Sequence, residues 1–223
     1  GGDKNPGTIA DTEEYNSSIN VLTAGAWATG GSLNTGRYFL GGTGTQTAGL
    51  AFGGFDSSAS GKTEQYDGST WSEQNDLGTA RYTIGGAGIQ TAALGFGGGP
   101  GTKNETEEYN GTSWSEQNNL STGRRSIGGT GTQTAGLAFG GFTGSISDAT
   151  EEYDGTSWTN GGALNTARRI SSGSGTQTAG LAIGGGRPNT GATEEYNGSA
   201  WSESGDLIMS RRTGGASHGA GRP

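Results

Sequence analysis

A tryptophan repeat with a period of about 44 residues dominates this sequence. Trp27, Trp71, Trp114, Trp158 and Trp201 are separated by 44, 43, 44 and 43 residues. A Leu lies six residues after each Trp, an Arg lies ten residues after it, and a Tyr lies five residues before each of the last four. Because a fixed period of this length is the signature of a repeat architecture, we expect units that are stable only when packed on their neighbours.

The composition alone would indicate an unstructured chain. Of the 223 residues 49 are Gly, and hydrophobic residues make up only 28%. Such values are typical of low-complexity segments. The regular spacing of the five Trp argues against that interpretation.

Each unit carries the signals of β-strands. The segment Thr134–Gly141 alternates small and large residues and ends in a Gly pair, which is typical of a strand that runs into a turn. The Tyr and Trp segments are joined by Asp-Gly or Asn-Gly pairs such as Asp154-Gly155, which favour a hairpin. Residues 1–223 are therefore predicted to form one all-β domain, a five-bladed β-propeller with four antiparallel strands in each blade of about 44 residues.

The abundant small residues also fit a propeller. Inner strands crowd together near the axis, and Gly and Ala allow that close approach. The Tyr, Trp, Leu and Phe side chains are expected to fill the wedge between neighbouring blades.

The order of these residues resembles the kelch motif over essentially the whole chain. A Gly pair is followed about a dozen residues later by Tyr, then by Trp, and then by the Arg that opens the next inner strand. The resemblance implies that the strands run outward from the axis as the Arg, Gly-Gly, Tyr and Trp strands. The wording Thr106-Glu-Glu-Tyr-Asn-Gly-Thr-Ser-Trp114 is also similar to kelch-type repeats in structural proteins of marine bacteriophages. That similarity implies a virion or extracellular location.

Closure of the predicted ring is incomplete. The last blade would combine residues 211–221 with outer strands from residues 11–28, and its second strand would be missing. Two hypotheses address the unpaired backbone: the 223 residues are a segment of a longer chain, or the insertion Ser18–Ala26 compensates.

Several kinds of chemistry are disfavoured. The chain has no Cys and one His, which argues against thiolate zinc sites, imidazole metal clusters and Ser-His-Asp triads. The net charge of -8 argues against nucleic-acid binding, and no apolar run is long enough for membrane insertion. We therefore expect no metal, no cofactor and no enzymatic activity.

Five Glu and five Arg recur at fixed places in the units. A ring of Arg could capture anions at the channel, but the equal numbers favour internal ion pairs that hold the register between blades, since a buried Arg needs a partner. The residues are Glu13, Glu64, Glu107, Glu151 and Glu194, and Arg37, Arg81, Arg124, Arg168 and Arg211.

The variable positions are the candidate ligand-binding residues. The loop between the Gly pair and the Tyr strand differs in every unit and is predicted to share one face of the propeller with the segment after Trp. Its candidates are Phe55, Lys62, Lys103, Phe142, Arg187 and Asn189. The residue after each repeated Arg also varies and could line a central pocket: Tyr38, Tyr82, Arg125, Arg169 and Arg212. The alternatives are drift of solvent-exposed loops and side chains that only cover apolar surface.

These observations favour a non-catalytic module. We expect a structural or recognition propeller of a phage virion or surface assembly, whose partners are other structural proteins or surface glycans. A secreted lectin or adhesin is the first alternative, and a glycoside-active enzyme with a carboxylate-only site is the second.

Overall fold

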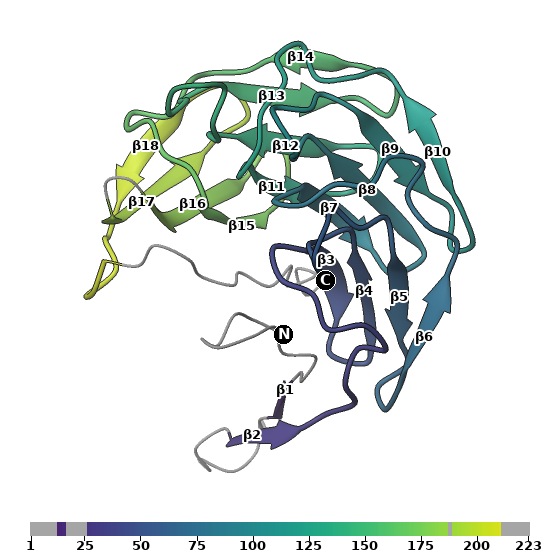
Figure 1. Cartoon of the computed structure of the whole chain (residues 1–223). Coiled ribbons are helices and arrows are strands. Elements are labelled where there is room, and N and C mark those ends of the chain that lie inside the picture. Colours follow the sequence, from purple (N-terminus) through teal and green to yellow (C-terminus); the bar gives the residue numbers. More distant parts are fainter. Residues whose placement is uncertain (1–12, 17–25, 187–188, 211–223) are drawn as a thin grey trace.

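The fold is a β-propeller built from four-stranded antiparallel sheets, as predicted. The computed structural model describes residues 13–16, 26–186 and 189–210. Four sheets follow one another along an arc, each with its first strand on the inner side and its fourth strand on the outer side (Figure 1). Within the described ranges no helix is long and apolar enough to cross a membrane.

Eighteen strands are defined in the described ranges. The first blade contains β3 (Gly41–Thr45), β4 (Ala48–Phe52), β5 (Thr63–Tyr66) and β6 (Trp71–Gln74). The second contains β7 (Gly85–Ile89), β8 (Ala92–Phe96), β9 (Thr106–Tyr109) and β10 (Trp114–Gln117). The third contains β11 (Gly128–Gly131), β12 (Gly136–Phe139), β13 (Thr150–Tyr153) and β14 (Trp158–Asn160). The fourth contains β15 (Ser172–Gly175), β16 (Gly180–Gly185), β17 (Thr190–Tyr196) and β18 (Trp201–Ser204).

The prediction of five blades was wrong. The described residues form four blades of four strands, and the unit of Trp27 contributes only a two-stranded sheet of β1 (Glu13–Asn16) and β2 (Ala26–Thr29). Tyr15 pairs with Trp27 there, the same register as Tyr66 with Trp71 in the first blade. The number of Trp residues therefore gives the number of outer hairpins. An outer hairpin supplies only two of the four strands of a blade. The remaining segments invoked for closure, residues 17–25 and 211–221, lie outside the described residues.

The Tyr–Trp hairpins form where predicted, with a longer loop than a two-residue turn. Four residues separate the paired Tyr66 and Trp71, and of these only Gly68 takes a positive φ, 94°. The Asp67 carboxylate accepts hydrogen bonds from the backbone N–H groups of Ser69 and Thr70, both at 2.8 Å. The Asp therefore caps the loop while the Gly supplies the left-handed residue.

Apolar side chains fill the wedges between blades, as predicted. One core cluster joins Leu50 and Phe52 of the first blade to Ala93 and Tyr109 of the second. The Phe52 ring also contacts Trp114 of the second blade, with ring centroids 4.9 Å apart. The same contact recurs between Phe96 and Trp158 and between Phe139 and Trp201.

Polar side chains connect the same neighbouring blades. The indole N–H of Trp158 donates to Thr106 Oγ1 at 2.9 Å, and Trp114 and Trp201 repeat this bond with Thr63 and Thr150. The Tyr196 hydroxyl donates to the Glu152 carboxylate of the preceding blade. Burial, and then the bond to Glu152, raise the pKa of Tyr196 to about 12.

This pKa shift predicts a loss of stability in alkaline solution. Because the ordinary pKa of Tyr is about 10, the neutral hydroxyl stabilises the fold below about pH 10, and this contribution is lost as the pH rises towards 12. The free energy of unfolding should therefore decrease over this pH range, and we expect this decrease to be about 2 kcal/mol smaller in Tyr196→Phe. Urea unfolding followed by Trp fluorescence from pH 9 to 12 measures it. An identical pH slope in the two proteins would contradict the assignment.

Candidate binding site

Four buried Arg residues fix the segments that build the site. Arg37, Arg81, Arg124 and Arg168 are at most 1% exposed. The Nη2 of Arg124 donates to Glu151 Oε1 at 2.8 Å, and its Nη1 donates to the carbonyls of Gly140 and Ala149. The corresponding ion pairs are Arg37 with Glu64, Arg81 with Glu107 and Arg168 with Glu194.

The favoured interpretation of these residues as ion pairs is confirmed for four Arg, but their location differs from the prediction. Each pair lies within one blade rather than between two. The second oxygen of Glu151 accepts from the backbone N–H of Ser121 at 2.7 Å, in the crossover that enters the blade. The pair therefore anchors the crossover on the third strand. The side chain of Glu13 and the whole of Arg211 are outside the described residues.

Burial and the facing carboxylate shift the pKa of these guanidinium groups in opposite directions. Burial is the larger effect and lowers the pKa of Arg37, Arg81 and Arg124 from the ordinary value, while the paired Glu raises it. Since the ordinary pKa of Arg is above 12, the charge is retained at neutral pH. These Arg are committed to carboxylates and carbonyls and do not form an anion-binding ring.

The second residue after each buried Arg has a strained backbone. Phe39, Thr83, Ser126 and Ile170 take positive φ values of 57°, 50°, 54° and 58°. A side chain at positive φ costs about 1–3 kcal/mol, most for a β-branched residue. Hydrogen bonds between blades offset the cost: Thr83 N–H donates to Phe39 O at 2.7 Å, Ser126 N–H to Thr83 O at 3.0 Å and Ile170 N–H to Ser126 O at 2.8 Å. The four blades thus meet through a chain of backbone bonds at the entrance of their inner strands.

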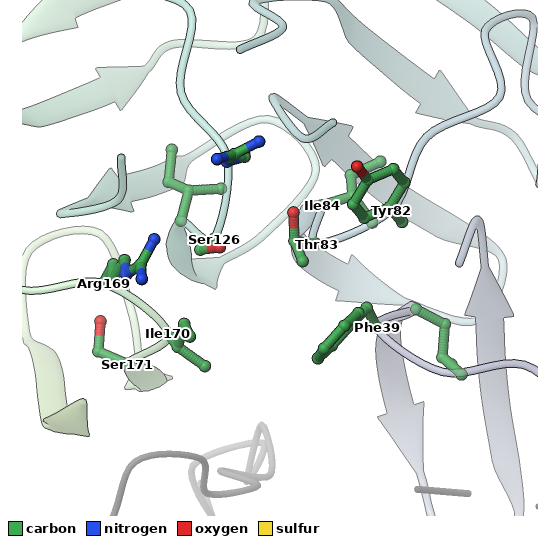
Figure 2. A pocket seen from close by; sticks show the side chains of 11 residues that line it. Phe39, Tyr82, Thr83, Ile84, Ser126, Arg169, Ile170 and Ser171 are labelled. Carbon is green, nitrogen blue, oxygen red and sulfur yellow. The ribbon is translucent and has the colours of Figure 1, made fainter. Parts of the chain in front are cut away.

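A cavity of about 360 Å³ lies at this junction. In Figure 2 Arg169, Ile170 and Ser171 lie on one side, Phe39, Tyr82, Thr83 and Ile84 on the other, and Ser126 between them. Eleven described residues line the cavity, and all come from the three positions that follow a buried Arg: Phe39, Leu40, Tyr82, Thr83, Ile84, Arg125, Ser126, Ile127, Arg169, Ile170 and Ser171.

Two clusters of stacked side chains lie beside the cavity. Phe55 contacts Tyr38 and Tyr82, with ring centroids 5.3 and 5.4 Å away. Phe142 holds the guanidinium groups of Arg125 and Arg169 over its ring, at 4.9 and 5.0 Å from the centroid. One cluster is therefore aromatic and the other is cationic, and both consist of variable positions of the repeat.

The structure places six of the eleven predicted site residues in these two clusters: Tyr38, Tyr82 and Phe55 in the aromatic one, and Arg125, Arg169 and Phe142 in the cationic one. Backbone bridges join Tyr38 to Phe55 and Arg125 to Phe142. Of the six, Tyr82, Arg125 and Arg169 line the cavity. The predicted common face is also confirmed, because Leu77 N–H in the segment after Trp donates to Gly61 O of the variable loop at 2.9 Å.

The other five predicted residues lie outside both clusters or outside the described residues. Lys62 Nζ donates to Thr35 Oγ1 at 2.7 Å and lies 3.8 Å from a carboxylate oxygen of Glu73. Lys103 Nζ pairs with Glu105 at 3.1 Å, and Asn189 is an exposed turn residue. Arg187 and Arg212 lie outside the described residues.

Sequence reasoning missed the second and third residues after each Arg. They are the apolar and hydroxyl side chains of the cavity wall, and they also differ between units: Phe39 and Leu40, Thr83 and Ile84, Ser126 and Ile127, Ile170 and Ser171. Their variation beside an invariant Arg was the available signal.

The described lining of the cavity combines apolar, hydroxyl and cationic side chains. The described residues that line the cavity include two Arg and no Asp, Glu or His. No cluster of three or more His, Asp or Glu placed to hold a metal ion occurs in the described ranges. Cavities of about this size hold small ligands and are mostly apolar with a few convergent polar groups.

No protein-family model matches the sequence, and no curated protein matches it. The kelch-type and phage resemblances therefore rest on the motif residues alone. The β-propeller itself rests on the strand order and register.

Proposed function

We propose that this propeller is a non-catalytic binding module that takes protein or glycan ligands at the mouth formed by the segments after the buried Arg residues. The observation that carries the proposal is the convergence of variable residues from four blades on one cavity, next to an invariant Glu–Arg frame. A rigid frame with variable side chains at one end is the usual arrangement of a recognition surface.

Solvent exposure in the cavity supports this proposal. Phe39 lines the cavity and is 49% exposed, although it is among the largest apolar side chains of the protein. An exposed aromatic residue in a concave site is a typical contact for a ligand.

The resemblance to kelch-type repeats of phage structural proteins supports a more specific setting. We propose that the module belongs to a virion or another surface assembly, with structural proteins of that assembly or surface glycans as its partners. A secreted lectin or adhesin would use the same mouth, so the binding experiment applies equally to that alternative.

A glycan array probed with the full chain tests the proposal. We expect selective binding that is lost in Phe39→Ser and retained in Ile89→Ser. Ser occurs naturally at the equivalent strained position, Ser126, so the first change is compatible with the fold. Ile89 is the matched control, because it is 55% exposed and lies at the opposite end of the inner strands.

Two results would oppose the proposal. Binding that survives Phe39→Ser, or equal loss in both variants, would place the ligand elsewhere. Cleavage of a bound oligosaccharide, detected by mass spectrometry, would contradict the non-catalytic assignment.

A further inference from the structure

We propose that Asn110 and Asn197 are sites of hydrolytic deamidation, and that the fold directs this reaction to them. The sequence contains three Asn-Gly pairs: Asn110-Gly111, Asn160-Gly161 and Asn197-Gly198. All three Asn residues are exposed, so neither the sequence nor access to water separates them. The hydrogen bonds around each pair do.

Deamidation at an Asn-Gly pair is an intramolecular reaction. The peptide nitrogen of the Gly loses its proton and attacks the side-chain carbonyl carbon of the Asn, and a cyclic succinimide forms as ammonia leaves. Water then opens the ring. Opening at the side-chain carbonyl gives Asp, and opening at the main-chain carbonyl gives isoaspartate, whose main chain is one carbon longer. The net reaction consumes one water and releases one ammonia, and the missing side chain of Gly leaves the attack unobstructed.

The loop after Tyr109 holds the amide of Asn110 in a reactive arrangement. Asn110 Oδ1 accepts hydrogen bonds from the backbone N–H groups of Thr112 and Ser113, both at 3.0 Å. The bond from Thr112 closes a ring that contains the peptide nitrogen of Gly111, which holds the amide group next to that nitrogen. Both donors also face the oxygen on which negative charge develops during the attack, as in an oxyanion hole.

The attacking nitrogen of Gly111 is not committed to another bond. Within the described ranges its N–H donates no hydrogen bond, so none has to break before the proton is removed. The half-exposed Gly111 takes a φ of 93° in the loop. Nucleophile and electrophile are therefore both available in the folded protein.

The loop of Asn197 repeats this arrangement in the fourth blade. Its Oδ1 accepts from the backbone N–H groups of Ser199 and Ala200, both at 3.0 Å, and from Ser199 Oγ at 2.9 Å. Gly198 takes a φ of 89°, and no described residue accepts a bond from its N–H. We therefore expect Asn197 to react like Asn110.

The third pair is held in the sheet and lacks these features. Asn160 is the last residue of β14, and the N–H of Gly161 donates to Thr150 O at 2.9 Å. Asn160 Oδ1 accepts a long bond of 3.5 Å from Ser121 Oγ. A Cβ on Gly161 would lie 2.6 Å from the Tyr196 hydroxyl, which shows how closely this Gly is packed. Attack by Gly161 therefore requires the strand to open first.

The repeat shows that the fold accepts Asp as the product. Asp67 and Asp154 occupy the equivalent positions in the first and third blades. Asp154 Oδ1 accepts from the backbone N–H groups of Thr156 and Ser157, both at 2.8 Å. These bonds lower the pKa of Asp154 from its ordinary value, so the carboxylate is favoured in this loop.

Isoaspartate would disturb the hairpin instead. Tyr109 pairs with Trp114 across the loop, and Asn110 N–H donates to Ser113 O at 3.2 Å. A longer main chain between the paired strands cannot keep both contacts. Since the Trp114 indole donates to Thr63 of the first blade, isoaspartate at this position should weaken the contact between two blades.

Peptide mapping by mass spectrometry tests the proposal on the full chain aged in mildly alkaline buffer. In the folded protein we expect Asn110 and Asn197 to deamidate at least about 10-fold faster than Asn160, because only the first two have donors on the reacting carbonyl. The same chain in guanidinium chloride is the matched control. There the loop geometry is lost, and the three rates should become similar.

A variant extends the test to a loop that now carries Asp. Asp67→Asn creates a fourth Asn-Gly pair at a position where the Asp67 carboxylate accepts from Ser69 and Thr70 N–H and Gly68 takes a φ of 94°. We expect this Asn to deamidate as fast as Asn110. Asn110→Asp should keep the melting temperature of the unmodified chain, whereas aged protein rich in isoaspartate should melt at a lower temperature.

Three results would overturn the proposal. Equal rates at the three natural pairs in the folded protein would show that the fold does not select among them. Slower reaction of Asn110 in the folded protein than in guanidinium chloride would show that the loop protects its amide. An intact amide in aged Asp67→Asn would show that the shared hydrogen bonds do not promote the reaction.

Discussion

Replacing Glu151 by Gln is expected to lower the free energy of unfolding by about 3 kcal/mol or more. The carboxylate is 1% exposed and faces Arg124 Nη2 at 2.8 Å, and the guanidinium is fully buried. Removing the negative charge leaves a buried positive charge without its counterion, which costs more than the pair contributes. The amide would also weaken the bond from Ser121 N–H that anchors the crossover.

Urea unfolding at neutral pH measures this effect, with Glu116→Gln as the matched control. Glu116 is exposed on β10, so its replacement should change the free energy by no more than about 0.5 kcal/mol. A loss below about 1 kcal/mol for Glu151→Gln would show that the ion pair is not a main support of the blade.

The second large effect concerns the inner strands. Replacing Gly173 by Ala on β15 would place a Cβ 2.3 Å from the carbonyl oxygen of Gly129 on the neighbouring inner strand β11. The carbonyl belongs to the backbone, and no rotatable bond can move the Cβ aside, so relief requires the two blades to move apart. We expect Gly173→Ala to destabilise the protein by about 3 kcal/mol, at the upper end of the usual effect of overpacking.

The repeat supplies a matched control for this change. Gly42 occupies the equivalent position on β3, and among the described residues the nearest atom to a new Cβ is the Leu50 carbonyl oxygen at 3.5 Å, an ordinary contact. Gly42→Ala should therefore be neutral or slightly stabilising, since Ala restricts the unfolded chain more than Gly. Thermal unfolding of both variants measures the difference. Similar losses of stability would indicate that the effect comes from the conformational preference of Ala and not from a steric clash.

Both predictions concern residues that hold the blades together, whereas the mouth is built from the variable residues that follow each buried Arg. Arg124 is buried and invariant in the repeat, and the next residue, Arg125, reaches the cavity. Changes at the first position should alter stability, and changes at the second should alter binding. In the binding module that we propose, this separation would allow one scaffold to carry different ligand specificities.

Much of the local structure could be predicted from the sequence because it depends on short-range patterns. The strands β13 and β14 flank Asp154-Gly155, the pair from which a hairpin was predicted. The Glu–Arg pairing followed from equal numbers of two residues that are costly to bury alone. Variation between copies of one unit also pointed to six residues that the structure places in two clusters beside the cavity.

Only the tertiary structure decided how many units become complete blades and which variable residues meet. Thr83 N–H donates to Phe39 O at 2.7 Å between two blades, although Thr83 lies 44 positions after Phe39 in the sequence. No local pattern encodes that contact. The same assembly places Phe142 under Arg125 and Arg169 and leaves Lys62 beside Glu73. The physical reason is that strand formation depends on neighbours in the chain, whereas the mouth exists only where edges of four separate sheets come within hydrogen-bonding distance.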